Sequence, residues 1–280
     1  SLFENILNRS VESTLGVLGI RDKNLRLHLK SQMSNDLVNN NRLLSDPVFE
    51  ATFPWEEVNE TFDDLGKRDF LSPSFIQALN KKHMKVPFDD DLLDLSSQAM
   101  ESHWHPRKHQ LQSWEVLKGK DPKSLIVTSG TGSGKTECFM IPIIDDLVRQ
   151  YEASQQQLEG VQALFIYPLN ALINSQRERI LSWTLNYQDK IRFCLYNGNT
   201  RKPAFPANTL KGRPKNEVYD RHHLWQSPPP ILITNPTMLE YMLIRTEDRP
   251  ILNTSQGKMK YIVLDEAHTY IGSQAAELAL

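Results

Sequence analysis

The chain has 280 residues, of which 39 % are hydrophobic and 24 % charged, with a formal net charge of −2. A chain of this composition can bury a core without a disulfide or metal staple, and its two distant cysteines, Cys138 and Cys194, exclude a disulfide scaffold and indicate a reducing compartment. No apolar run approaches the roughly 18 residues of a membrane span and no secretory signal is visible, so we expect a soluble, cytoplasmic protein with no membrane partner.

The first hundred residues are predicted to be mainly helical. Apolar residues recur there at helical spacing in two groups: Leu2, Phe3, Ile6 and Leu7, then Leu25, Leu29 and Met33. A stretch punctuated by prolines follows, and we expect its aromatic residues to pack it onto a neighbouring domain: Phe49, Phe53, Trp55, Phe62, Phe70 and Phe75. The acidic run 89–91 is predicted to be a solvated linker or a helix start.

From about residue 103, short apolar runs alternate with helical stretches. The predicted strands are 124–128, 163–167, 191–196, 231–234 and 261–265, and helices are predicted at 135–150 and 170–185. Runs that are apolar on both faces are typical of buried parallel strands, so this alternation predicts an α/β fold with a parallel sheet. We therefore expect two domains, a helical region over 1–102 and an α/β domain over 103–280.

Charge is distributed unevenly between these two parts. Residues 1–102 carry 11 Lys and Arg against 17 Asp and Glu, a balance of −6, whereas residues 103–280 carry 21 against 17, a balance of +4. The stretch 197–230 is rich in prolines and in basic side chains: Arg201, Lys202, Lys211, Arg213, Lys215 and Arg221. Its length indicates an insertion or a functional loop, and its charge fits either phosphate contacts or a solvated surface excursion.

The strongest local feature is the glycine-rich segment SGTGSGKT, from Ser129 to Thr136. It lies between a predicted strand and a predicted helix, the context that a phosphate-binding loop requires, although Ser129 replaces the usual first glycine. Its glycines allow backbone N–H groups to turn toward a phosphate, and the helix start adds a positive dipole. The predicted ATP-binding residues are Gly130, Thr131, Gly132, Ser133, Gly134, Lys135 and Thr136, with Lys135 on the β- and γ-phosphates and the Thr136 hydroxyl on Mg²⁺.

Two adjacent carboxylates, Asp265 and Glu266, follow the predicted strand 261–265. The ends of parallel strands meet at one edge of a sheet, which would bring this pair beside the phosphate loop. We expect Asp265 to hold Mg²⁺ and Glu266 to orient and deprotonate the attacking water. An acidic helix N-terminus without function is the alternative interpretation, which the phosphate loop upstream makes the weaker one.

Together these motifs resemble the first RecA-like domain of a superfamily 2 helicase with a DEAH box, over about residues 104–280. The resemblance implies ATP and Mg²⁺ as cofactors and Gln110, in RKHQLQSWE, as the residue that reads adenine. It makes His268 a signalling residue between ATP and nucleic acid. Three further segments resemble the motifs with which such enzymes contact a nucleic-acid strand, namely 167–176, 196–200 and 234–243. The nucleic-acid contacts that they imply are Pro168, Asn170, Gly198, Thr234, Asn235 and Pro236.

The phrases SGTGSGKTE, TNPTMLEYML and DEAHTYIGSQAAE are similar to those of large bacterial DEAH helicases with an extra C-terminal domain. That group serves DNA repair or phage defence and includes the Druantia-type helicase subunit, which implies DNA rather than RNA as substrate and defence or repair proteins as partners. Such motors close two RecA-like domains on ATP. The second domain and its arginine finger are missing from these 280 residues, so we expect this chain to be the N-terminal part of a longer polypeptide.

Three other interpretations stay open at this stage. The chain would also suit a nucleotide-gated nucleic-acid-binding module without unwinding, the motor subunit of a restriction-type complex, or an RNA helicase. Histidines at 103, 105 and 109 are predicted to be surface or packing residues rather than a metal site, since no cysteine lies at ligand spacing. Trp104 and Trp114 are the candidates for stacking on adenine, and core packing is the better interpretation for Trp114.

Overall fold

The computed structural model describes residues 2–35, 55–88, 91–130, 132–168, 170–206, 210 and 212–270. The chain falls into two compact units, residues 1–54 and 55–280. Each unit is described by itself below.

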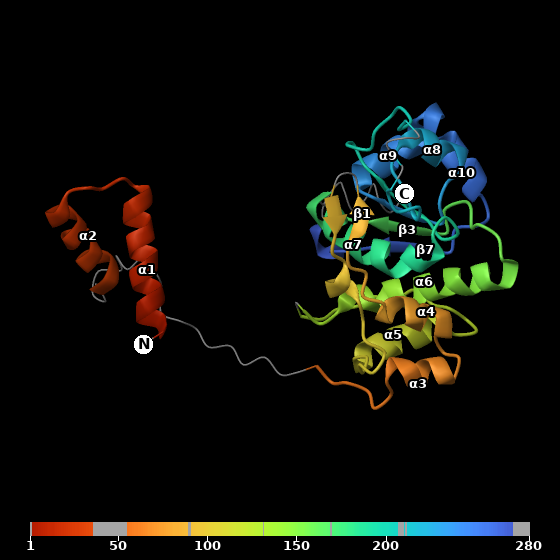
Figure 1. The fold of residues 1–280 in the computed structure, drawn as a ribbon, viewed down its shortest axis with the longest axis horizontal. Coiled ribbons are helices and arrows are strands. Elements are labelled where there is room, and N and C mark those ends of the chain that lie inside the picture. The colour runs from red at the N-terminus through yellow and green to blue at the C-terminus, as the bar shows by residue number, and fades with distance from the viewer. Residues whose placement is uncertain are drawn as a thin grey trace. The chain divides into compact units, whose positions relative to one another are not determined.

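The N-terminal unit is a pair of helices, α1 (Leu2–Val17) and α2 (Lys23–Asn35) (Figure 1). Leu7, Val11 and Leu15, each four residues apart, form its buried core, and Ile20, Leu29 and Met33 pack against them. Ile6 and Leu25, which the helical pattern also included, are about half exposed. The predicted helical N-terminal region is confirmed, with a narrower apolar face than expected.

The second unit is built on a parallel five-stranded sheet in the order β5-β4-β6-β3-β7. The strands are β3 (Ala163–Ile166), β4 (Phe193–Tyr196), β5 (Glu217–Val218), β6 (Ile231–Thr234) and β7 (Tyr261–Leu264). The predicted α/β class with a parallel sheet is confirmed. Strand β5, which was not predicted, has two residues and is too short to leave a periodic signal.

The predicted strand at 124–128 is wrong in this structure. These residues have no regular secondary structure, and Ile126 is 89 % exposed. An apolar run rich in β-branched residues favours a β-strand, but a strand forms only where a neighbouring strand supplies backbone hydrogen-bond partners. In the described structure no strand pairs with this segment, which runs outside the sheet, and β7 at the sheet edge pairs only with β3.

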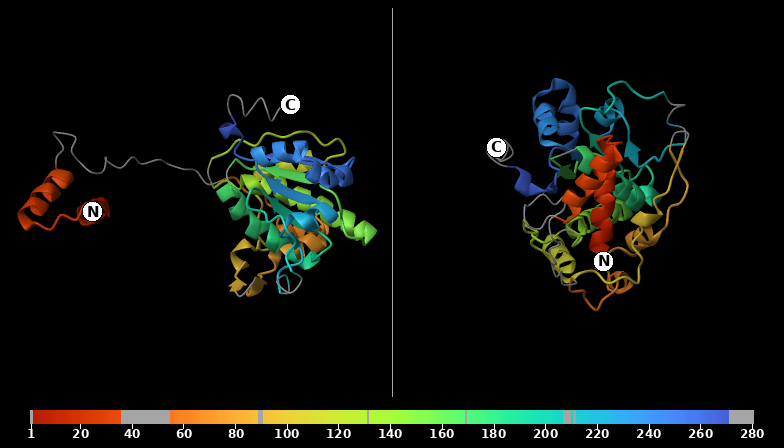
Figure 2. Two further views of the ribbon diagram at one scale, coloured as in Figure 1. Left: turned by 90° about the horizontal axis from the view of Figure 1, so that it is seen from above. Right: turned by 90° about the vertical axis from the view of Figure 1, so that its left-hand side faces the viewer.

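Helices cover both faces of the sheet, as Figures 1 and 2 show. On one face lie α5 (Lys108–Lys118), α6 (Lys135–Ser154) and α7 (Asn170–Thr184), and on the other α8 (Arg221–Gln226), α9 (Pro236–Ile244) and α10 (Arg249–Ser255). Successive strand residues alternate between the two cores: Phe165 and Tyr167 face the α6 side, whereas Leu164 and Ile166 face the α9 side. Short 3₁₀ helices lie at Ser96–Gln98, Leu185–Tyr187, Thr246–Asp248 and Ala267–Thr269.

Residues 55–102 belong to the same compact unit as the sheet. They form α3 (Phe62–Lys67), α4 (Pro73–Asn80) and an antiparallel hairpin of β1 (Val86–Phe88) and β2 (Asp91–Leu93). Phe62 and Phe75 are buried in one core with Trp114 of α5, as expected for packing aromatics. Phe49, Phe53, Asp89 and Asp90 lie outside the described residues, and Asp91 begins a strand rather than a helix or linker.

A buried carboxylate ties this segment to α6. Asp145 is fully buried, pairs with Lys118 of α5, accepts from Arg149 at 3.1 Å, and accepts the backbone N–H of Ser72 at 2.6 Å. A buried charge is tolerated only when it is paired and hydrogen-bonded, so this network locks α4 onto the α5–α6 pair. This contact agrees with the boundary between the two compact units, which lies after Pro54. An accessory role for residues 1–102 stays a prediction.

Candidate nucleotide and nucleic-acid site

The phosphate loop ends at the N-terminus of α6. Gly132 and Gly134 have φ of 76° and 77°, the left-handed region that favours glycine, and Gly134 is the N-cap of α6. A Cβ at Gly134 would lie 2.3 Å from Nε2 of Gln110, so no larger residue fits there without displacing that side chain. Thr131, one of the predicted ATP-binding residues, lies outside the described residues.

Lys135 and Ser129 show how the loop closes on itself. The Lys135 ammonium donates to the backbone oxygen of Ser129 at 2.8 Å and reaches that of Gly130 at 3.4 Å. Ser129, which replaces the first glycine of the motif, places its hydroxyl 2.5 Å from that of Ser133. Carbonyl oxygens are weaker partners for an ammonium than phosphate oxygens, so this lysine is available to a nucleotide.

The start of α5 clamps the loop from one side. Arg107 Nη1 donates to the oxygen of Gly132 at 2.6 Å, Nε2 of His109 lies 2.9 Å from the oxygen of Ser133, and Gln110 Nε2 donates to the oxygen of Gly134 at 3.1 Å. Gln110 also accepts the backbone N–H of Arg107 at 2.9 Å. Its amide keeps one further donor and acceptor site, so adenine recognition by Gln110 stays a prediction.

Trp55 is a residue of this site that sequence reasoning missed. Its ring lies 3.4 Å from where a Cβ at Gly130 would be, stands edge-on to His109 with centroids 5.7 Å apart, and is 38 % exposed. Trp114 is in the core as expected and donates its Nε1 proton to the oxygen of Glu137 at 2.9 Å. Arg107 and His109 closely precede Gln110 in the sequence, which was a usable signal, whereas Trp55 is brought in by the fold.

Asp265 and Glu266 follow β7 at the carboxyl edge of the sheet. The N–H of Asp265 continues the ladder to the oxygen of Ile166 at 3.1 Å, and the Asp265 carboxylate accepts the N–H of Glu266 at 2.9 Å. Glu266 has φ of 50°, an uncommon conformation for a residue with a side chain, of the kind that clusters at functional sites. Nδ1 of His268 lies 3.3 Å from the Glu266 carboxylate.

Electrostatics link this pair to the phosphate loop. Burial raises the pKa of Asp265, the Glu266 charge adds to the rise, and the Lys135 and Arg179 charges and the N–H of Glu266 act against it. A half-buried carboxylate whose charged form is disfavoured gains from a cation. Carboxylate and hydroxyl oxygens are the ligands that Mg²⁺ prefers, and Asp265 and Thr136 supply one of each, so the residues fit a magnesium–ATP complex.

The predicted nucleic-acid contacts end neighbouring strands at the same edge. Pro168 follows β3, Gly198 follows β4, and Asn235 and Pro236 follow β6, and these three strands are adjacent in the sheet. Asn235 caps α9 by accepting the N–H of Met238 at 2.8 Å, and Pro236 opens that helix. The fold thus gathers these positions in one row, and their contact with nucleic acid stays a prediction.

Two positions of this row behave differently from the rest. Thr234 is fully buried and its hydroxyl donates to the oxygen of Tyr196 at 2.7 Å, so that hydroxyl is engaged inside the protein. Asn170 begins α7, but its side chain lies outside the described part of the structure.

The basic stretch 197–230 is partly folded onto aromatic rings. The Arg213 guanidinium lies 4.8–4.9 Å from the ring centroids of Phe88, Phe205 and Tyr219, and Arg221 lies 5.3 Å from that of Tyr196. Arg177 of α7 forms a buried pair with Glu217 of β5 at 2.6 Å. These cation–π and ion-pair contacts hold the excursion against the sheet, which neither of the two interpretations from sequence anticipated.

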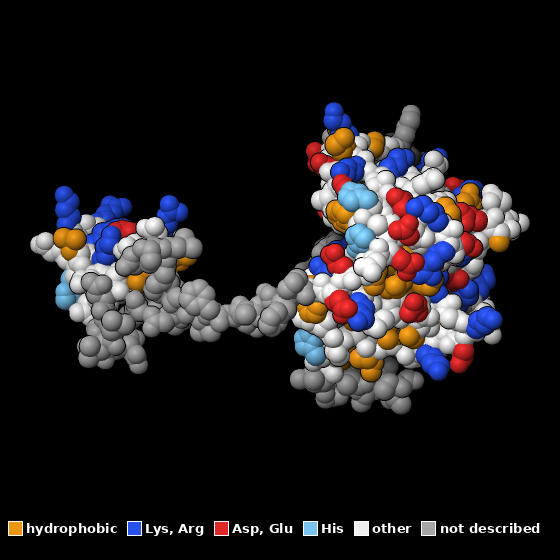
Figure 3. Space-filling model, turned by 90° about the horizontal axis from the view of Figure 1, so that it is seen from below, with side chains coloured by type: hydrophobic (Ala, Val, Ile, Leu, Met, Phe, Trp, Pro, Cys, Tyr) orange, Lys and Arg blue, Asp and Glu red, His pale blue; other side chains and the backbone are white. Residues whose placement is uncertain are grey.

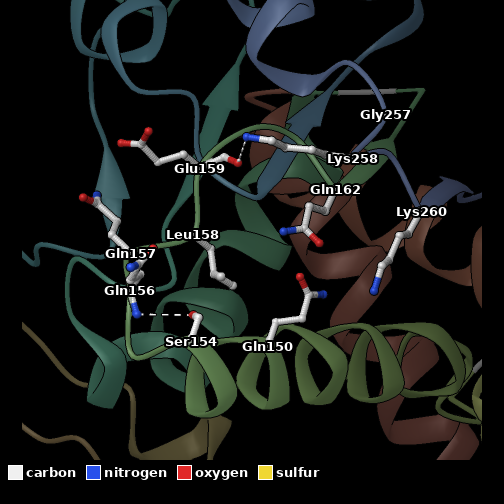
Figure 4. A pocket seen from close by; sticks show the side chains of 10 residues that line it. All are labelled: Gln150, Ser154, Gln156, Gln157, Leu158, Glu159, Gln162, Gly257, Lys258 and Lys260. Atoms are coloured by element: carbon white, nitrogen blue, oxygen red, sulfur yellow. Dashed lines mark hydrogen bonds between the residues drawn. The ribbon is translucent and has the colours of Figure 1, made fainter.

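Two other features lie away from the phosphate loop. Ligand atoms of Asp220, His222 and His223 lie within 4.8 Å of one another, but the Asp220 carboxylate already caps α8 through the N–H of His223. A pocket of about 380 Å³ lies at the far end of α6, and its lining includes Gln150, Ser154, Lys258 and Lys260 (Figure 4). It is at the amino edge of the sheet, opposite the phosphate loop. Figure 3 shows charges of both signs interspersed over one face of the unit 55–280.

Comparison with known proteins decides the family. The model of the DEAD/DEAH box helicase family matches residues 107–279. The chain belongs to this family. It is 28 % identical to Druantia protein DruE of Escherichia coli (strain UMEA 4076-1), over 68 % of this chain and 15 % of DruE. It is 27 % identical to the ATP-dependent helicase Lhr-Core of Sulfolobus acidocaldarius, over 66 % of this chain and 20 % of that protein.

Among solved structures, the chain is similar to the DUF1998 helicase MrfA bound to DNA and AMPPNP. The TM-score is 0.43 at 24 % identity, over 71 % of this chain and 21 % of MrfA. The chain thus spans about a fifth or less of the length of the relatives named here. Among the described residues, no helix is long and apolar enough to cross a membrane.

Proposed function

We propose that this DEAD/DEAH box helicase chain is the ATP-binding motor lobe of a DNA helicase or translocase. One observation carries the proposal: the Lys135 charge acts on Asp265, which follows β7 at the sheet edge where the predicted nucleic-acid motifs also lie. ATP hydrolysis at one end of this row and contact with the nucleic acid along it would then be coupled through the ends of the same β-strands. Residues 1–102 are proposed as an accessory region, and 103–280 as the lobe itself.

Each residue of the nucleotide site has a role in this proposal. The N–H groups of Gly130 to Thr136 would cradle the phosphates, and Lys135 would neutralise charge on the β- and γ-phosphates. Thr136 and Asp265 would hold Mg²⁺, which supplies charge neutralisation at the phosphates when it is bound. Glu266 would orient the attacking water and accept its proton. Gln110 and Trp55 would contact the base.

The substrate is proposed to be DNA and the pathway phage defence or DNA repair. The segments SGTGSGKTE and DEAHTYIGSQAAE, which are similar to those of large bacterial DEAH helicases, support DNA, and the similarity to DruE supports defence. The chain is also 27 % identical over 180 residues to an ATP-dependent rRNA helicase, spb4 of Aspergillus fumigatus, so RNA is the alternative that an experiment must separate. A second RecA-like domain and defence or repair proteins are the proposed partners.

The decisive experiment measures ATPase activity of the full-length protein with Glu266→Gln. This variant keeps the shape of the side chain and removes the base, so turnover should fall by about 10²–10⁴-fold while ATP still binds. Unchanged turnover would remove Glu266 from the mechanism. Single-stranded DNA should stimulate the wild type more than RNA of the same sequence, and the reverse order would favour an RNA helicase.

The second candidate function is a nucleotide-gated binding module that holds DNA without unwinding it. A strand-displacement assay on a partial duplex separates the two functions. Displacement that requires ATP and is lost in Glu266→Gln supports the motor. ATP-dependent DNA binding without displacement or translocation would support the module instead.

A further inference from the structure

A tyrosine with a buried, unpartnered hydroxyl lies beside the proposed magnesium-binding carboxylate. Tyr167 directly follows β3, and Asp265 directly follows β7, its neighbour in the sheet. Ile166 and Leu264 are register partners, so Tyr167 and Asp265 form the next row, with strands about 4.8 Å apart. The N–H of Asp265 binds the oxygen of Ile166 at 3.1 Å, which holds this row in register.

Both side chains lie on the α6 face of the sheet. Phe165 and Tyr167 belong to the core that Tyr261 and Val263 also contact, and residues two apart on a strand share a face. Asp265 continues the series from Tyr261 and Val263. This face carries α6, and the phosphate loop leads into the N-terminus of that helix.

The Tyr167 hydroxyl is an anomaly for a core residue. The side chain is fully buried, and its oxygen has no hydrogen-bond partner among the described residues. Buried hydroxyl groups almost always have one, because leaving a donor unsatisfied costs free energy that a phenylalanine of the same shape would avoid. Packing therefore does not account for the hydroxyl. A hydrogen-bond partner that comes within reach in another state of the site would account for it.

Asp265 is the acceptor that suits this donor. Burial raises the pKa of Tyr167 and the charge of Asp265, its neighbour in the next row of the sheet, adds to the rise. Arg179 of α7 also acts on both groups, but it is paired with Glu137 at 3.2 Å and has no acceptor atom for the phenol proton. Tyr270 directs its own hydroxyl to the oxygen of Ile166 at 3.3 Å.

We propose that Tyr167 is a positioning residue that donates a hydrogen bond to the Asp265 carboxylate when magnesium and nucleotide are bound. Tyr167 does not touch the metal. This hydrogen bond would orient the carboxylate so that one oxygen faces Mg²⁺ while the other accepts from the Tyr167 hydroxyl. Hydrogen bonds to metal-binding carboxylates commonly orient them in this way. The inference rests on the proposed ATPase function.

The test compares Tyr167→Phe with Tyr187→Phe in the full-length protein. Tyr187 is also a buried tyrosine, but its hydroxyl lies 3.3 Å from that of Ser74, away from the site. The measurement is the affinity for a fluorescent ATP analogue with Mg²⁺ and with EDTA. In Tyr167→Phe the affinity gain from Mg²⁺ should fall about tenfold, as for the loss of one hydrogen bond, with affinity in EDTA unchanged. In Tyr187→Phe both should match the wild type.

Two results would overturn the inference. One is a Mg²⁺ effect in Tyr167→Phe equal to that in Tyr187→Phe, and the other is an equal loss with and without Mg²⁺, which indicates a packing role. As a second readout, Tyr167→Phe should have no added effect on the Mg²⁺ gain in an Asp265→Asn background. A wild type whose nucleotide affinity does not depend on Mg²⁺ would instead contradict the proposed function, so the two failures are distinguishable.

Discussion

The central strands of the sheet and its β7 edge are built in opposite ways. Every residue of β3 and β6 is buried, whereas β7 alternates between half-buried and exposed residues, with Ile262 65 % exposed. The proposed catalytic carboxylates follow the exposed strand, and the phosphate loop is likewise only partly buried. Tight packing fixes the scaffold, while the groups that must meet a ligand lie at the edge where packing leaves access.

The largest expected effect tests the edge. Lys135→Ala should lower ATPase turnover by about 10²–10³-fold, because a charge aimed at the phosphates is lost. Its melting temperature should stay close to that of the wild type, since the ammonium is held by backbone oxygens of a partly exposed loop. Lys123→Ala, at an exposed position just before the loop, is the matched control. A large loss of stability in Lys135→Ala would break the contrast between edge and centre.

The next effect compares the two regions directly. Phe165→Ala in β3 removes a fully buried ring and should reduce the free energy of unfolding by about 3–5 kcal/mol. Ile262→Ala in β7 should cost less than about 1 kcal/mol, because its side chain is mostly exposed. Urea unfolding of the chain monitors both. Similar losses in the two variants would mean that the β7 edge is covered in solution.

A smaller effect concerns the base side of the nucleotide site. Trp55→Ala should raise KM for ATP about tenfold with little change in kcat, since stacking of a base on an aromatic ring contributes about 1–3 kcal/mol. Trp104→Ala removes another exposed tryptophan that was a candidate from sequence alone, and it serves as the control. An effect confined to Trp104→Ala would return the adenine contact to that residue.

The smallest effect is a pH dependence within the packed region. Burial lowers the pKa of His83 from 6.5, with the Lys81 charge adding to it, and its Nε2 is buried without a partner in the described structure. The folded state therefore disfavours protonation, so stability is fully present above pH 6.5 and is lost as pH falls through the folded pKa. His83→Gln should flatten this loss in melting experiments between pH 7 and about 5, and exposed His103→Gln should not. If the melting temperature of His83→Gln depends on pH as strongly as that of the wild type, protonation of His83 does not affect stability.

The local patterns predicted the parts of this protein that carry their own signal. Glycines before a helix, two carboxylates after an apolar run, and apolar runs bounded by turns all reflect short-range requirements. Four of the five predicted strands are therefore confirmed, and the phosphate loop and Asp265–Glu266 could be singled out as site predictions. The prediction of a strand at 124–128 was wrong because a strand also needs a neighbouring strand to pair with, and the local pattern does not determine that pairing. The two-residue β5 has too few residues for any pattern.

The sequence by itself determined the family, the fold class and the order of the motifs, because each follows from residues close together in the chain. Only the tertiary structure decided that residues 55–102 share a core with the sheet and that Trp55 and His109 lie against the phosphate loop. It also placed Tyr167 beside Asp265, almost a hundred residues further along the chain. These relations depend on which strands and helices pack together, and that is set by the total burial of distant side chains rather than by any local preference.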